Sequence, residues 1–240
     1  MALRSPIVLF ALLRACGAGP DARAAELLTR LTREQKFWQL FMIPGDLDSA
    51  AFDYSKGIFG LQISAAPGVP LRAAARAHAA RVDSIQRWFI ARTGIPIIVF
   101  DEALHGLTRE GATVFPQAIA LAATWDSSLV RQFVRAFEMQ GIIATPKHFV
   151  ANVGEGGRDS YPIDVSRRAL EERYFPPFRS LIVDAAARSV MTAYNSVDGS
   201  PATQSAMLMN GVLKREWGLG GFIISDAAAT GGATVLFAAS

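Results

Sequence analysis

Short continuous runs of apolar residues occur along the chain. In the longer segments between these runs, the apolar residues fall on one helical face. Five runs are typical of strands: 57–64 "GIFGLQIS", 95–100 "IPIIVF", 141–145 "GIIAT", 189–194 "SVMTAY" and 221–225 "GFIIS". Their alternation with helical segments predicts a parallel α/β protein.

Polar residues and glycines mark where the helices between these strands begin and end. Thr32 and Gln35, for example, have the spacing of a capping box. The predicted helices are one after Thr32, one over 71–92 that stops before Gly94, one capped by Asp126 that runs to about Gln140, one after Ser166 that Pro176 and Pro177 end or kink, and one from Ser205 to Trp217.

Chemically useful side chains follow four of the five strands. Glu102, Lys147 with His148, Tyr194 and Asp226 each come at or just after a strand end. In an α/β barrel these positions meet on one face, where active sites lie. We therefore expect a TIM-type (β/α)8-like barrel over residues 20–240, incomplete because only five strands are evident, with no internal domain boundary.

Composition agrees with a large buried core, because 51% of the 240 residues are hydrophobic and 19% are charged. The net charge of +3 comes mostly from scattered arginines, which we interpret as solvated helix faces rather than a nucleic-acid surface. Cys16 is the only cysteine, so no disulfide forms within the chain. His78, His105 and His148 lack the spacing of metal ligands, so we expect neither a metal nor another cofactor.

The first 19 residues have the outline of an export signal. Arg4 precedes an apolar stretch over 7–13, and small residues follow. This predicts a signal peptide over 1–19 and an exported protein, periplasmic or extracellular. A lipid anchor on Cys16 is an alternative, although "LRAC" fits such a site poorly. No other segment approaches the roughly 20 apolar residues of a membrane span.

Each candidate residue also has a purely structural interpretation. Asp226 is either the N-cap of a following helix or a carboxylate that acts as nucleophile or base. Lys147 and His148 are either a surface lysine beside a core histidine or a pair of hydrogen-bond donors suited to sugar hydroxyls or to phosphate. Pro146 fixes the backbone just before that pair.

Two further positions leave alternatives open. Either Asp101 or Glu102 caps the following turn, and the other can accept hydrogen bonds from sugar hydroxyls. Tyr194 is either a wall of the pocket or a phenol close to a nucleophile. A phosphate-handling barrel is a third possible class of function. It needs a glycine-rich anion loop late in the chain, for which only "TGGAT" at 230–234 is a candidate.

Several segments, taken in order, resemble glycoside hydrolase family 3 in its β-glucosidase and β-xylosidase branch. They span roughly Leu31 to Asp226. The matching stretches are "LTREQKFWQLF", "GIPIIVFDEALHGL", "GATVFPQAIALAATWD", "ATPKHFVAN", "SVMTAYNSVDGSPAT" and "LKREWGLGGFIISD". The loop after the lysine and histidine, "VANVGEGGRDSY", lacks the catalytic histidine of the hexosaminidase branch, which favours the glucosidase or xylosidase branch.

The resemblance implies an eight-stranded barrel and hydrolysis of terminal non-reducing β-D-glucosyl or β-D-xylosyl residues with retention. Oligosaccharides or aryl β-glycosides would be the substrates. The implied roles are Asp226 as nucleophile, Glu102, Lys147 and His148 as ligands of the terminal sugar's hydroxyls, Tyr194 beside the nucleophile, Met191 on the same strand and Arg158 in a charged loop.

The chain departs from the family pattern in three places. A strand and helix with a sugar-binding arginine are missing near the join of Gln132 and Phe133, and Ala227 replaces a frequent tryptophan. The second carboxyl group that a retaining hydrolase needs comes from a later region in this branch. We therefore expect an internally shortened, C-terminally truncated barrel with exposed apolar surface and weak activity. The alternative is a non-catalytic carbohydrate-binding barrel.

Overall fold

The computed structural model describes residues 20–44, 47, 52–63, 71–107, 112–153 and 161–230. The chain divides into two compact units, 1–117 and 118–240, each of which is described by itself. The predicted signal peptide with Cys16, the loop residue Arg158 and most of "TGGAT" lie outside the described residues.

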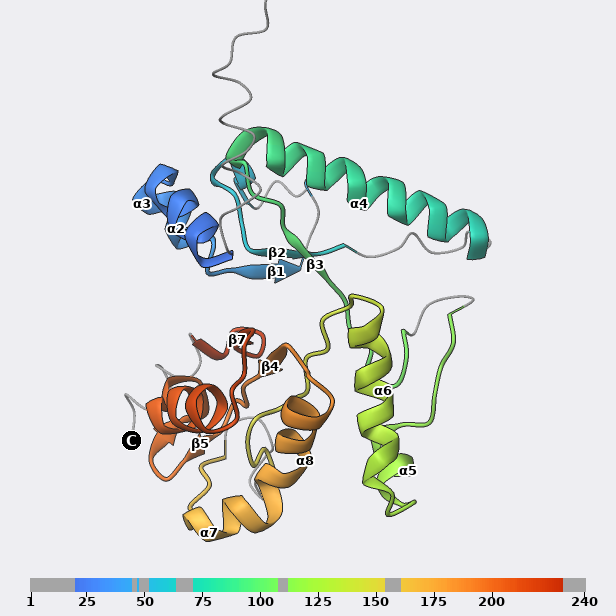
Figure 1. Cartoon of the computed structure of the whole chain (residues 1–240), viewed down its shortest axis with the longest axis vertical. Helices are drawn as coiled ribbons and strands as arrows, with labels where there is room; N and C mark the ends of the chain where they lie inside the picture. The colour runs from blue at the N-terminus through green and yellow to red at the C-terminus, as the bar shows by residue number, and fades with distance from the viewer. Residues whose placement is uncertain are drawn as a thin grey trace, which may run out of the picture. The chain divides into compact units, whose positions relative to one another are not determined.

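Unit 1 is built on a parallel sheet of three short strands in the order β1 (Met42–Pro44), β2 (Gly60–Gln62) and β3 (Ile98–Phe100). Its helices are α2 (Pro20–Arg30), α3 (Arg33–Trp38), the 3-10 turn η1 (Tyr54–Lys56) and α4 (Leu71–Thr93). Figure 1 shows α4 lying along this sheet, and its Ile85 and Phe89 share a core cluster with Leu61 of β2.

Two predicted helix boundaries in unit 1 are confirmed. The Thr32 hydroxyl accepts from the Gln35 N–H at 3.1 Å, and the Gln35 side chain accepts from the Thr32 N–H at 2.9 Å, which completes the capping box before α3. The long helix α4 ends at Thr93, because Gly94 has a φ of +74° that most residues avoid.

Unit 2 contains the parallel pair β4 (Ser189–Met191) and β7 (Phe222–Ile224) and the antiparallel hairpin β5 (Ser196–Val197) and β6 (Ser200–Pro201). Its helical segments are α5 (Ala118–Ala122), α6 (Ser127–Met139), α7 (Arg167–Ala169), η2 (Leu170–Tyr174), α8 (Phe175–Arg179), η3 (Ser180–Asp184), η4 (Ala202–Gln204) and η5 (Met207–Glu216). The Asp126 carboxylate caps α6 by accepting from the Ser128 N–H at 2.8 Å, as predicted.

The core of unit 2 contains an aromatic cluster. Phe149 is fully buried, and its ring contacts those of Phe175, Phe178 and Trp217 at centroid distances of 5.1–5.7 Å. The segment that carries the predicted Lys147 and His148 pair is thereby anchored to α8 and to the end of η5.

One prediction for unit 2 is wrong, and one of two alternatives is excluded. The run 141–145 forms no strand, and residues 146–149 pair with β4 instead. Pro176 and Pro177 do not end their helix, which continues to Asp184. The wider π-type turn of η2, which precedes the prolines, relieves the clash between a proline ring and the carbonyl four residues earlier.

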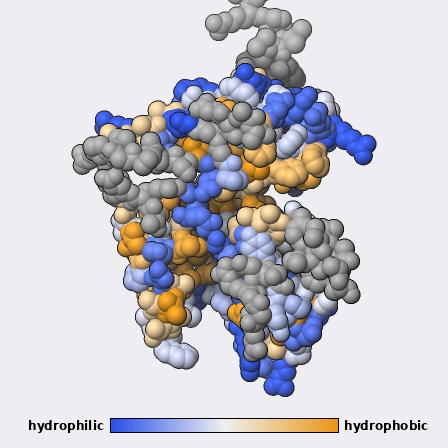
Figure 2. Space-filling view, turned by 180° about the vertical axis from the view of Figure 1, so that it is seen from behind, coloured by the Kyte–Doolittle hydropathy of each residue, from blue (hydrophilic) through white to orange (hydrophobic). Residues whose placement is uncertain are grey.

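Large apolar side chains are exposed in the described part of unit 2. The most exposed are Ile119, Trp125 and Met139, at 78%, 95% and 73%. Figure 2 shows hydrophobic surface over the α5 and α6 part of this unit. Among the described helices of the chain, none combines the length and the apolar character of a membrane span.

Candidate active site

Three parallel segments of unit 2 end side by side. β4 pairs with β7 in a register that sets Met191 opposite Ile224, and on its other side it pairs with the segment 146–149. The Phe149 N–H donates to the Met191 carbonyl at 2.8 Å, and the Thr192 N–H donates to the Ile224 carbonyl at 2.9 Å. Residues that follow parallel strands therefore gather at one edge.

Asp226 and His148 meet at this edge. The Asp226 Oδ2 lies 3.0 Å from the His148 Nε2, and the two side chains are only 12% and 16% exposed. An ionised carboxylate can only accept hydrogen bonds, so Nε2 carries the hydrogen whenever Asp226 is ionised. The contact joins the ends of two elements that are 78 positions apart in the chain.

The other carboxylate oxygen of Asp226 accepts from the Ala227 N–H at 2.7 Å. An N-cap would instead accept from an N–H two or three residues later, so the side chain does not act as the predicted helix cap. Both oxygens are oriented by one donor each, and each keeps a lone pair directed elsewhere. This arrangement suits a carboxylate that attacks a bound electrophile.

Tyr194 fixes the backbone beside this carboxylate. Its hydroxyl donates to the Ala227 carbonyl at 2.7 Å, so the end of β4 is tied to the residue after Asp226.

Met191 is half-buried, and its N–H donates to the Pro146 carbonyl at 3.0 Å. Lys147 is also half-buried, and the Lys147–His148 and Phe149–Val150 peptide bonds are cis.

Glu102 lies in unit 1, directly after β3, and is exposed. Its N–H donates to the Asp101 Oδ1 at 2.8 Å, and the Gln62 side chain donates to the same oxygen at 3.3 Å. Of the two adjacent acids, Asp101 therefore takes the local structural role. Glu102 belongs to unit 1, whereas Lys147, His148, Met191, Tyr194 and Asp226 belong to unit 2.

Two residues that hold the site were not among the predicted ones. Asn195 is buried, and its Nδ2 donates to the Val150 carbonyl at 3.2 Å, which joins the loop after His148 to the loop after β4. Glu138 accepts from the N–H groups of Ala144 and Arg188 at 2.8 and 3.0 Å and pairs with the Arg188 guanidinium. An acid in the last turn of a helix is unfavourable, and this was the available signal for Glu138.

Among the described residues, no cluster of His, Cys, Asp or Glu could hold a metal ion. The group at the strand ends consists of a carboxylate, an imidazole, an ammonium and a phenol. Together they offer a nucleophile and several hydrogen-bond donors for a polyhydroxylated ligand.

Residues 126–240 match the model of the glycosyl hydrolase family 3 N-terminal domain. This part of the chain therefore resembles glycosyl hydrolase family 3. The matched range contains Lys147, His148, Met191, Tyr194 and Asp226, and Glu102 precedes it.

Curated relatives are similar to parts of the chain. A probable β-glucosidase K of Aspergillus fumigatus is 39% identical over 129 residues, which is 48% of this chain and 17% of the relative. A β-glucosidase of Rhizobium radiobacter is 28% identical over 194 residues, which is 57% of this chain and 24% of the relative. The chain thus spans between a sixth and a quarter of these relatives.

Solved structures resemble a larger part of the chain. A β-glucosidase of Erythrobacter marinus superposes with a TM-score of 0.73 at 26% identity, covering 89% of this chain and 37% of that one. A Listeria innocua β-glucosidase in complex with isofagomine gives a TM-score of 0.70 at 22% identity, covering 91% of this chain and 38% of that one. The chain therefore has a barrel-like α/β fold similar to that of these β-glucosidases.

Proposed function

We propose that this chain is a retaining β-glycosidase that releases terminal non-reducing β-D-glucosyl or β-D-xylosyl residues from oligosaccharides or aryl glycosides. The observation that carries the proposal is the contact between Asp226 and His148 at the ends of adjoining parallel segments. The substrate class comes from the relatives, which are named β-glucosidases and, in Formosa agariphila, a β-xylosidase.

In this proposal an Asp226 oxygen attacks the anomeric carbon, and the bond from that carbon to the leaving oxygen breaks. The leaving group takes a proton from an acid, and a glycosyl ester of Asp226 forms. Water then attacks the same carbon and gives a proton back to the acid, which lost its own in the first step. The bond to Asp226 breaks, and the sugar is released with its original configuration. The acid is a second carboxyl group, which retaining enzymes hold about 5–5.5 Å from the nucleophile.

The remaining residues bind the sugar before the attack. Lys147 and His148 donate to hydroxyls of the terminal ring, and Glu102 and Arg158 complete its polar contacts. Met191 lies on β4, which pairs with the strand before the nucleophile, and Tyr194 holds the Ala227 carbonyl. Holding the ring over the carboxylate converts the attack into an intramolecular step.

Turnover of 4-nitrophenyl β-D-glucoside and β-D-xyloside by the full chain tests this function. We expect Asp226→Asn to abolish turnover, because an amide is a far weaker nucleophile, and to leave far-UV circular dichroism unchanged. Asp164→Asn is the matched control, because Asp164 is an exposed acid of the same unit. Turnover that survives in Asp226→Asn would contradict the assignment of the nucleophile.

The alternative is a barrel that binds saccharides without cleaving them. It uses the same contacts from Lys147, His148 and Tyr194 and differs only in lacking the acid. If the chain binds cellobiose, if Asp226→Asn alters that binding, and if neither glycoside is turned over, this alternative replaces the hydrolase.

We also propose export through residues 1–19, as the sequence predicts. Sequencing the N-terminus of the protein recovered from the culture medium or the periplasm tests this proposal. A mature chain that begins near residue 20 supports it, and an intact Met1 contradicts it.

A further inference from the structure

Unit 2 carries a groove whose lining shares no residue with the candidate active site. It has a volume of about 410 Å³, within the range of pockets that hold small molecules. It lies among the helical segments α7, η2, α8 and η3 and the end of η5. The residues that the argument uses are Arg167, Glu171, Arg179, Asp184, Glu216 and Trp217.

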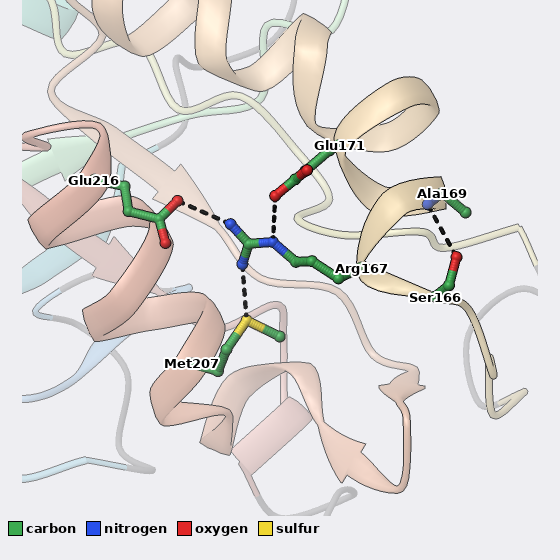
Figure 3. Close-up of polar contacts among 6 residues, drawn as sticks. All are labelled: Ser166, Arg167, Ala169, Glu171, Met207 and Glu216. Carbon is green, nitrogen blue, oxygen red and sulfur yellow. Dashed lines mark hydrogen bonds and ion pairs between the residues drawn. The ribbon is translucent and has the colours of Figure 1, made fainter.

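One wall of this groove is a fixed charge network, shown in Figure 3. The Arg167 guanidinium donates to the Glu171 Oε1 at 2.7 Å, to the Glu216 Oε2 at 2.9 Å and to the Met207 sulfur at 3.4 Å. The hydrogen bond to Glu171 and the pairing with Glu216 raise the pKa of Arg167. Arg167 therefore orients both acids.

Each of these two acids keeps an oxygen for a ligand. The Glu171 Oε2 and the Glu216 Oε1 accept no hydrogen bond from the described residues, although their partner oxygens are bound to Arg167. Both side chains are about half exposed, at 54% and 50%. The wall thus presents two oriented acceptors, which suit hydroxyl donors.

Other residues of the groove supply a donor and an aromatic surface. Arg179 is exposed and makes no hydrogen bond or ion pair with any residue that the structure describes. Asp184 is already engaged by the Ser180 hydroxyl at 3.1 Å and by Arg131 at 3.5 Å. Trp217 is half-buried, and its ring stands edge-on to that of Phe175 at 5.3 Å.

This mixture of groups selects against several ligand classes. Phosphate and other anions would meet the Glu171 and Glu216 carboxylates, and cations would meet Arg179. A purely apolar ligand would leave these charges desolvated. An uncharged ring with hydroxyls at its rim and C–H groups on its face satisfies the acceptors, the guanidinium and the indole together.

We propose that this groove is a second saccharide-binding site, which takes one or two uncharged pyranose units. It goes beyond the proposed hydrolysis, because it needs no contribution from Asp226. A saccharide held there would keep a longer polymer close to the chain.

Titration of the full-length Asp226→Asn variant with cellotriose and xylotriose, by calorimetry and by the NMR signal of the Trp217 indole N–H, tests the groove. We expect millimolar binding that shifts this signal, and at least a tenfold weaker affinity when Arg179→Ala is added. Arg173→Ala is the matched control. Arg173 is an exposed arginine without a partner among the described residues, and it lies outside the groove lining.

Unchanged affinity in Arg179→Ala would overturn the second site, and so would a Trp217 signal that no saccharide moves. Binding of inorganic phosphate in place of the sugars would overturn its ligand class. The two proposals fail separately. Groove binding without any glycoside turnover leaves the second site standing, whereas turnover with a silent Trp217 signal leaves only the hydrolase.

Discussion

Gly221 is the position where one added carbon should disturb both stability and function. A Cβ at Gly221 would lie 1.6 Å from the Arg188 carbonyl oxygen and 2.6 Å from its carbon. That carbonyl accepts the Phe222 N–H at 3.1 Å and so begins the pairing of β4 with β7. A carbon and an oxygen seldom approach within about 3.3 Å, so in Gly221→Ala one strand has to move by more than about 1 Å.

Two effects follow from that movement. Overpacking of this kind costs about 1–3 kcal/mol, and we expect the upper end because both partners are backbone. Since Asp226 follows β7 and Tyr194 follows β4, a shift of about 1 Å should also lower turnover by roughly 10²-fold. Urea unfolding followed by circular dichroism gives the first quantity, and hydrolysis of the aryl glucoside gives the second.

The neighbouring Gly220 provides the control. A Cβ there meets no atom within 4 Å, so Gly220→Ala should change the free energy of unfolding by no more than about 0.5 kcal/mol. If Gly221→Ala and Gly220→Ala were equally stable and equally active, the inferred coupling between strand pairing and the site would be wrong.

Three further variants probe the frame around the site. Phe149→Ala removes a fully buried ring and should lower the free energy of unfolding in urea by about 3–5 kcal/mol. Trp125→Ala changes a ring that is 95% exposed and should lower it by less than about 0.5 kcal/mol. Equal losses in the two variants would refute the aromatic core. Glu138→Ala leaves two backbone N–H donors without an acceptor and should lower the free energy of unfolding by about 3 kcal/mol or more. Glu138→Gln should recover part of this loss. If Glu138→Ala were as stable as the unchanged chain, the structural role of Glu138 would be refuted. The hydrogen bonds from the Ser128 side chain and backbone hold the pKa of Asp126 below its ordinary value, so its stabilisation is complete above about pH 4 and is lost as the pH falls through the lower folded pKa. Asp126→Asn should therefore flatten the acid side of a plot of melting temperature between about pH 2 and pH 7, and an unchanged slope would contradict that reasoning.

Local signals in the sequence predicted a helix boundary correctly wherever a single residue determines that boundary. The caps at Thr32, Asp126 and Ser166 and the stop before Gly94 follow from backbone hydrogen-bond needs within a single turn, and each is present. The hairpin turn at Asp198 and Gly199, where both φ angles are positive, had an equally local signal that was not used.

Features that depend on partners distant in sequence could not be predicted in this way. The run 141–145 has the composition of a strand, but the segment that pairs with β4 begins at Pro146. Clustering of Lys147, His148, Tyr194 and Asp226 was predicted from strand ends, whereas the direct contact between His148 and Asp226 depends on strand register, which periodicity does not specify. Asn195 and Glu138 hold the site through backbone groups of other segments, and such bonds leave only a weak trace in sequence.

The most direct test of the proposed mechanism is covalent trapping of the nucleophile. The full chain is incubated with 2,4-dinitrophenyl 2-deoxy-2-fluoro-β-D-glucoside, in which the fluorine slows hydrolysis of the glycosyl ester, and peptide masses are then measured. We expect one added fluoroglucosyl group on the peptide that contains Asp226, and none in Asp226→Asn. Labelling at a different residue would contradict the assignment of Asp226, and a chain that turns over glucoside without forming any adduct would contradict the retaining mechanism.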